Sequence, residues 1–184
     1  WYWERYTPGT TAILNDEINR EHQWARLKLL WEGYEKLGND IYGGLLLESV
    51  FSNLPLFSNY QGSILNAPAF YPLNDSRTRI LPEFRAPHYV AGGARLIYNP
   101  FGRFDIRLEG YAFKPVMDIS ESEPQVPEKV LWESPIRYAG TINAVYHSPI
   151  GPVSLALNYY DSQVESWSVL GHVGYLLFNR KSWE

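Results

Sequence analysis

Cysteine is absent from the 184-residue chain, which excludes disulfide bridges and thiolate metal sites. The chain also lacks any run of about twenty apolar residues, which argues against a helical membrane protein. Its net charge of -4 argues against a nucleic-acid partner. No signal peptide is recognisable, and the chain opens on Trp1 instead of a methionine. We therefore expect a fragment, or a mature or trimmed form, of a longer protein.

Catalytic and metal-binding motifs are also missing. No Gly-x-Ser-x-Gly nucleophile elbow occurs, and there is no glycine-rich phosphate loop. The four histidines, His22, His88, His147 and His172, are far apart, and no two of them have the spacing of metal ligands. A lone histidine on a strand face is more often hydrogen-bonded than catalytic. We expect no catalytic residue, no metal and no cofactor in this chain.

The strongest signal that is present is alternation of residue type in residues 136–178. In residues 153–160, for example, Val153, Leu155 and Leu157 lie on one face, and Ser154 and Asn158 lie on the other. A period of two residues over about ten positions is the pattern of a β-strand. Three such stretches are present, and the first two are joined by a short turn that contains two prolines.

The same alternation occurs earlier in the chain. It predicts strands over residues 23–37, 41–51, 88–99 and 104–113, although a helix is an alternative for the first of these. The sequence thus predicts an all-β, antiparallel fold with two strands within 22–51 and five within 88–178. Residues 52–87 contain five prolines and many aromatic residues, which favours a long packed loop. Residues 114–135 are acidic and proline-rich, and we expect an exposed extracellular loop there.

The composition of the two strand faces favours a transmembrane β-barrel. In residues 104–113 the charged residues Asp105, Arg107 and Glu109 alternate with apolar ones. Charges are unfavourable in lipid, but a wet lumen accepts them. Aromatic residues make up 16% of the chain and fit interfacial girdles. The girdle candidates are Trp31, Tyr98, Tyr138, Tyr146, Tyr159, Trp167 and Tyr175. A soluble β-barrel with the two faces inverted remains the alternative.

The turn Ser148-Pro149-Ile150-Gly151-Pro152 and the pair Gly92-Gly93 carry a family resemblance. They resemble a turn before the penultimate strand and a strand-opening glycine pair in the barrels of the bacterial surface antigen, or outer-membrane assembly-factor, superfamily. The order of a long loop followed by five strands is also similar. The resemblance implies an integral outer-membrane protein of which this chain supplies the last seven of sixteen strands. Its expected partners are outer-membrane lipid, the remaining strands and an N-terminal domain.

The long loop departs from that family in one respect. The family has an Arg-Gly pair at the loop tip, whereas this chain reads Glu83-Phe84-Arg85-Ala86. The resemblance implies that Arg85 folds into the lumen, where Asp105 or Glu109 would be its partner. Together with Arg107, these residues form the predicted lumen network. A solvated Arg85 is the alternative.

Three further segments resemble a subgroup of that superfamily, the barrels that follow a patatin-like phospholipase domain in Bacteroidetes. These segments are Ala67-Pro68-Ala69-Phe70-Tyr71-Pro72, Phe84-Arg85-Ala86 and the ending Leu177-Phe178-Asn179-Arg180-Lys181-Ser182. The resemblance implies that this barrel anchors such a domain, and is a possible conduit for it, with the catalytic residues outside the present chain. A barrel that assembles or translocates other proteins is one alternative. A soluble ligand-binding β-barrel is another.

Overall fold

The computed structural model describes residues 2–3, 21–22, 24–124, 126–149, 151–162 and 166–174. The predicted all-β, antiparallel fold is confirmed. Eight strands form one antiparallel sheet, which does not close on itself. A separate pair of two-residue strands, β1 (Tyr2–Trp3) and β2 (Glu21–His22), lies before it.

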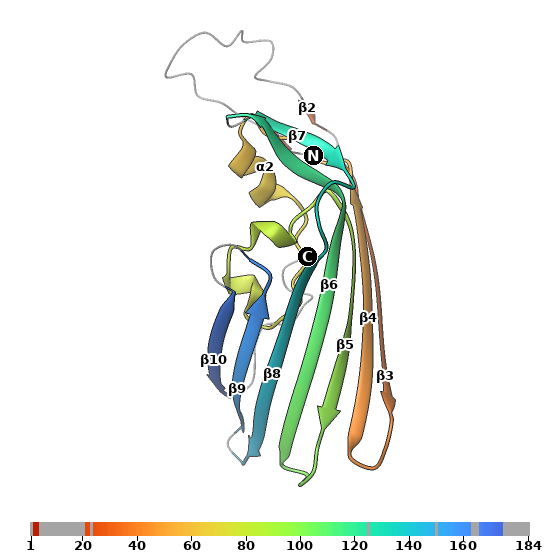
Figure 1. The fold of residues 1–184 in the computed structure, drawn as a ribbon, viewed down its shortest axis with the longest axis vertical. Helices are drawn as coiled ribbons and strands as arrows, with labels where there is room; N and C mark the ends of the chain where they lie inside the picture. Colours follow the sequence, from red (N-terminus) through yellow and green to blue (C-terminus); the bar gives the residue numbers. More distant parts are fainter. Residues whose placement is uncertain are drawn as a thin grey trace.

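Seven strands of the large sheet lie side by side in the order β10-β9-β8-β6-β5-β4-β3 (Figure 1). In chain order, the first two are β3 (Arg26–Lys36) and β4 (Ile41–Ser52). The others are β5 (His88–Tyr98), β6 (Phe104–Glu123), β8 (Arg137–Ser148), β9 (Gly151–Tyr160) and β10 (Trp167–Val173). The helical alternative for residues 23–37 is wrong, because β3 pairs along its whole length with β4.

The eighth strand corrects the prediction of a loop over residues 114–135. The strand β6 continues to Glu123, and β7 (Val126–Leu131) folds back on it, with Met117 opposite Leu131. Six strands rather than five therefore follow the long loop. The sequence does not predict this hairpin because its few apolar residues are mixed with prolines and acidic residues and do not alternate, while its backbone ladder needs no apolar face. The end of the last predicted strand, residues 175–178, lies outside the described residues.

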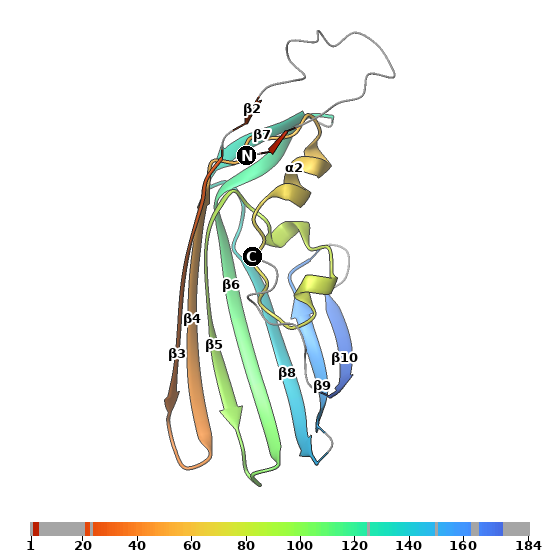
Figure 2. The ribbon, with the colours of Figure 1, turned by 180° about the vertical axis from the view of Figure 1, so that it is seen from behind.

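The long connection between β4 and β5, residues 53–87, folds over one face of the sheet (Figures 1 and 2). We call this the inner face and the opposite one the outer face. The loop contains α2 (Tyr60–Asn66) and the 3-10 helices η1 (Ser76–Thr78) and η2 (Pro82–Phe84). The Asn59 side chain accepts a hydrogen bond from the Gly62 amide, at 2.6 Å, and so caps the start of α2.

Aromatic packing attaches this loop to the middle of the sheet. Phe70 and Phe84 are almost fully buried, and both contact Phe113 of β6, with ring centroids 6.0 Å and 5.7 Å apart. Tyr89 of β5 packs against the same Phe113 ring at 4.9 Å. The main hydrophobic core therefore lies between the loop and the inner face, and not between two sheets.

Candidate functional site

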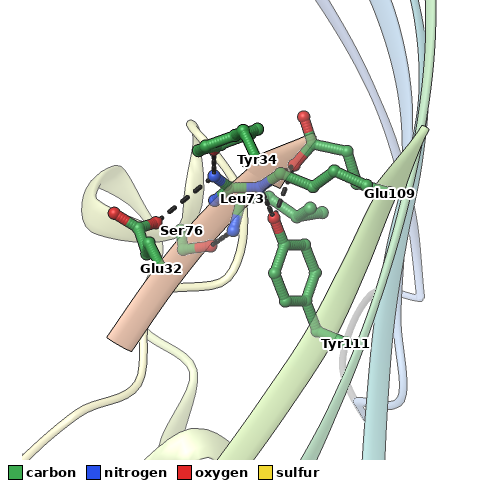
Figure 3. Close-up of polar contacts among 7 residues, drawn as sticks. Glu32, Tyr34, Leu73, Ser76, Glu109 and Tyr111 are labelled. Carbon is green, nitrogen blue, oxygen red and sulfur yellow. Dashed lines mark hydrogen bonds and ion pairs between the residues drawn. The ribbon is translucent and has the colours of Figure 1, made fainter. Parts of the chain in front are cut away.

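A polar network lies on the inner face and is centred on Arg95 of β5. The Arg95 guanidinium lies 3.3 Å from Glu32 of β3 and 3.2 Å from Glu109 of β6, and it donates to Tyr111 at 2.5 Å. It also donates to the Tyr34 hydroxyl. Figure 3 shows Glu32, Tyr34, Glu109 and Tyr111 converging, with Leu73 and Ser76 of the loop beside them. The network thus connects three strands through one partly buried cation.

Two inner-face glycines make room for the aromatic members of this network. Gly44 of β4 lies under the Tyr34 ring, and Gly93 of β5 lies under the Tyr111 ring. A Cβ atom added at Gly44 would stand 2.6 Å from Tyr34 Cε1, and one added at Gly93 would stand 2.2 Å from Tyr111 Cδ1. The two tyrosines can therefore fold across the neighbouring strands to reach Arg95. The two glycines of the predicted pair Gly92-Gly93 lie on opposite faces of the sheet: Gly93 faces inward, and alternation places Gly92 on the outer face.

A second polar cluster surrounds Asp105 near the short turns. Its carboxylate accepts from Asn99 at 2.6 Å and from Arg107 at 2.9 Å, and it lies 2.8 Å from His147 Nε2. Asp105 is buried even though it is charged. Of the four predicted lumen residues, Asp105 and Arg107 therefore meet in this cluster, whereas Glu109 belongs to the Arg95 network.

Arg85 occupies a different place from the one we expected. Its guanidinium donates to the backbone oxygen of Leu65 at 2.7 Å and to that of Ala67 at 3.3 Å. Among the described residues it forms no ion pair with Asp105 or Glu109. The reason is local, because the last turn of α2 leaves carbonyl groups without helical partners, and a cation near that end satisfies them. Arg85 thus connects two parts of the loop, its own segment and the end of α2, and does not connect the loop to the sheet.

The loop is held to the last two strands by residues that the sequence did not single out. Asp75, which is buried, accepts from the Tyr160 hydroxyl of β9 and from Ser168 Oγ of β10 at 3.0 Å. Ser76 Oγ lies 3.1 Å from the same Tyr160 hydroxyl. Sequence offers little signal for this cluster, because an aspartate in a polar, proline-rich loop is normally solvated.

The upper hairpin also contacts the loop. Lys129 of β7 donates to the Leu54 backbone oxygen at 2.8 Å, and burial lowers the pKa of Lys129. In α2, burial and the nearby carboxylates of Asp118 and Glu121 raise the pKa of Tyr60. These contacts place the start of the loop directly under the hairpin.

The turn motif Ser148-Pro149-Ile150-Gly151-Pro152 connects β8 to β9, and its Ile150 lies outside the described residues. Ser148 Oγ donates to the Gly151 backbone oxygen at 2.5 Å. Gly151 has a φ of 126°, a conformation that residues with a side chain rarely adopt. The motif therefore has a structural explanation, since it closes a tight turn between paired strands.

The outer face differs sharply from the inner one. The strand register places alternate residues of seven strands on it; Glu35 of β3 and Lys114 of β6 are charged and pair close to the ends of their ladders, and most of the other members are apolar. Their side chains are large, apolar and solvent-exposed; Leu108, Ile142 and Leu155 are 51%, 56% and 60% exposed. Exposed members on seven strands are Leu27, Leu29, Trp31, Leu45, Leu47, Phe51, Val90, Leu96, Tyr98, Ile106, Leu108, Tyr138, Ile142, Tyr146, Val153, Leu155, Leu157, Trp167, Val169 and Val173.

Within the described ranges, no three histidine or acidic residues are grouped so that they could hold a metal ion. No helix in this part of the chain is long and apolar enough to cross a membrane. Comparison of the chain with protein-family models, with curated proteins and with solved structures finds no significant match.

Proposed function

We propose that this chain is the C-terminal part of an integral outer-membrane β-barrel whose outer face contacts lipid. One observation carries the proposal: seven neighbouring strands expose a continuous, largely apolar outer face, while ion pairs, including that of the buried Asp105 with Arg107, lie on the inner face. Exposed apolar patches of this extent are rare on soluble monomers. A soluble barrel would place Ile106 and Leu108 in its core, yet these residues are on the exposed face.

The spacing of aromatic residues on β8 agrees with this proposal. Tyr138 and Tyr146 both lie on the outer face, with Gly140, Ile142 and Ala144 between them. Eight residues of strand span about 26 Å. Because the strands of membrane barrels tilt by about 40°, this segment would cross roughly 20 Å of the bilayer. The apolar band of such barrels is about 25 Å tall, which is a similar height. The two tyrosines would then lie near the two membrane interfaces.

The edges of the sheet support the existence of further strands. Among the described strands, β3 pairs only with β4, and β10 pairs only with β9. Unpaired backbone groups are strongly unfavourable in lipid, so a membrane wall must cover both edges. We propose that the missing strands belong to the same barrel, of which this chain would supply the last strands of sixteen.

For the role of the barrel, we propose that it anchors an N-terminal patatin-like phospholipase domain. The support is the resemblance of residues 67–72 and of the chain's end to barrels that follow such a domain. Because the loop covers the inner face with an aromatic core, the fold favours an anchor over an open conduit. A barrel that assembles other proteins is the competing proposal. The sequence that precedes this chain in the full-length protein would distinguish the two proposals. A Gly-x-Ser-x-Gly elbow with a later Asp-Gly there would support the phospholipase anchor, and small periplasmic αβ modules would support the assembly barrel.

The membrane location can be tested with two matched substitutions in the full-length protein. Leu108→Arg places a charge in the middle of the outer face, and Phe101→Arg places one at a turn tip that is 82% exposed. A charge at the bilayer centre destabilises a barrel by about 2–4 kcal/mol, and near the interface by about 0–1 kcal/mol. We expect Leu108→Arg alone to reduce the amount of protein that resists alkaline extraction from membranes. Equal recovery of both variants would contradict the proposal.

A further inference from the structure

The loop is held to the inner face in two chemically different ways. On the side of β5 and β6, its Phe70 and Phe84 are packed into the aromatic core. On the side of β9 and β10, the contacts of Asp75 are polar and pass through the Tyr160 and Ser168 hydroxyls. Residues 73–84, which we call the strap, thus span the inner face between an apolar attachment and a polar one.

The strap covers a part of the sheet that is polar and incompletely hydrogen-bonded. Leu73 and Asn74 close a cavity of about 30 Å³ whose other walls include Thr141, Asn143 and Asn158. Thr141 Oγ1 and Asn143 Oδ1 are buried, and neither has a hydrogen-bond partner among the described residues. The two residues are 9% and 8% exposed.

This arrangement sets two free-energy terms against each other. Burying a polar group without a partner is unfavourable, and water would relieve this if the strap moved away. Hydrogen bonds to a charged acceptor are among the stronger ones in proteins, so the bonds to Asp75 oppose that movement. The aromatic attachment to β5 and β6 does not pass through Asp75, because Phe70 packs on Tyr89 and Phe84 on Phe113. Phe84 also contacts the Tyr160 ring of β9, and this contact does not need the Tyr160 hydroxyl.

We infer that Asp75 is a latch: when its bonds to Tyr160 and Ser168 break, the strap swings about its aromatic attachment and opens the inner face of β8, β9 and β10 to water. The open state would expose a track of hydroxyl and amide groups that includes Thr141, Asn143 and Asn158. A surface of this chemistry suits water and small uncharged polar solutes. The latch would therefore control access to one side of the interior, and it does not depend on the membrane proposal.

Cysteine labelling of the full-length protein tests this inference, and this chain contains no native cysteine. Thr141→Cys places a thiol under the strap without removing a protein hydrogen bond. A water-soluble maleimide then reports how often the strap opens. In that background we expect Asp75→Ala to accelerate labelling by roughly tenfold or more, because several charge-assisted bonds are lost.

A matched control separates the latch from a general loss of charge. Asp118→Ala also removes a carboxylate that accepts from a serine hydroxyl, Ser134, but it lies in the upper hairpin. We expect Asp118→Ala to leave the labelling rate within about twofold, since it touches no strap residue. Equal rates in the two variants, with circular dichroism showing the sheet intact in both, would overturn the inference.

A second variant keeps the test decisive if Asp75→Ala does not fold. Tyr160→Phe removes the hydroxyl that joins β9 to Asp75 and Ser76, and it keeps the ring that packs against Phe84. Accelerated labelling in Tyr160→Phe supports the latch. An unchanged rate in this variant would refute it, whatever the result of the membrane-extraction test.

Discussion

At the scale of single residues, the inner face depends on side chains that meet across strands. Arg95 reaches carboxylates on both sides because Gly44 and Gly93 leave space above the sheet for tyrosine rings. The ion pairs of Arg95 are partly buried, and the small residues beside them determine which groups can reach the guanidinium. The glycines are therefore as much a part of the network as its charged groups.

Gly93→Ala should destabilise the protein by about 1–3 kcal/mol, because a Cβ atom there collides with the Tyr111 ring and with the Gly110 carbonyl oxygen. Gly110→Ala is the matched control. It lies on the adjacent strand opposite Ala94, and its Cβ atom would meet nothing within 4 Å. Denaturant unfolding in detergent measures both. A midpoint for Gly93→Ala no lower than that of Gly110→Ala would refute the role of Gly93.

At the scale of elements, the hairpins fix the register of the sheet. The turn from β8 to β9 places Ser148 opposite Gly151, and from there the two strands pair residue for residue to Ala139 and Tyr160. Because side chains alternate, a slip by one residue would exchange the inner and outer faces. The geometry of this turn therefore protects the apolar outer face.

Gly151→Ala should destabilise the protein by about 1–3 kcal/mol, since its φ of 126° strains any residue that carries a Cβ atom. Gly171→Ala in the middle of β10 is the control, because its Cβ atom would lie in open space. Thermal unfolding, followed by the loss of β-sheet circular dichroism, compares them. Equal melting temperatures would show that the turn tolerates a side chain.

The strands could largely be predicted from the sequence, and the tertiary contacts could not. Alternation predicts β3, β4, β5, the first half of β6, β8, β9 and β10, because a two-sided environment forces polar and apolar residues to alternate. It fails for β7, where apolar residues do not recur at every second position and proline interrupts the pattern. The bonds of Arg85 and Asp75 were beyond the sequence as well. They depend on where a 35-residue loop lies over the sheet, which local patterns do not specify.

At the scale of the whole molecule, the structure is a wall with two different surfaces. Its core lies between the loop and the inner face, so the outer face gains nothing from internal packing. A large apolar surface of this kind is stable only when another apolar medium or partner covers it. The proposed lipid contact explains both the outer face and the uncovered edges of β3 and β10.

The most direct test of this account is a single-cysteine scan of β8 from position 138 to position 146, in the full-length protein in lipid bilayers. Each cysteine carries an environment-sensitive fluorophore, and a lipid-soluble quencher reports contact with acyl chains. If the outer face contacts lipid, we expect quenching with a period of two: positions 138, 140, 142, 144 and 146 are quenched, and the odd positions are protected. Uniform quenching, no quenching, or quenching confined to the odd positions would contradict the assignment of the outer face to lipid.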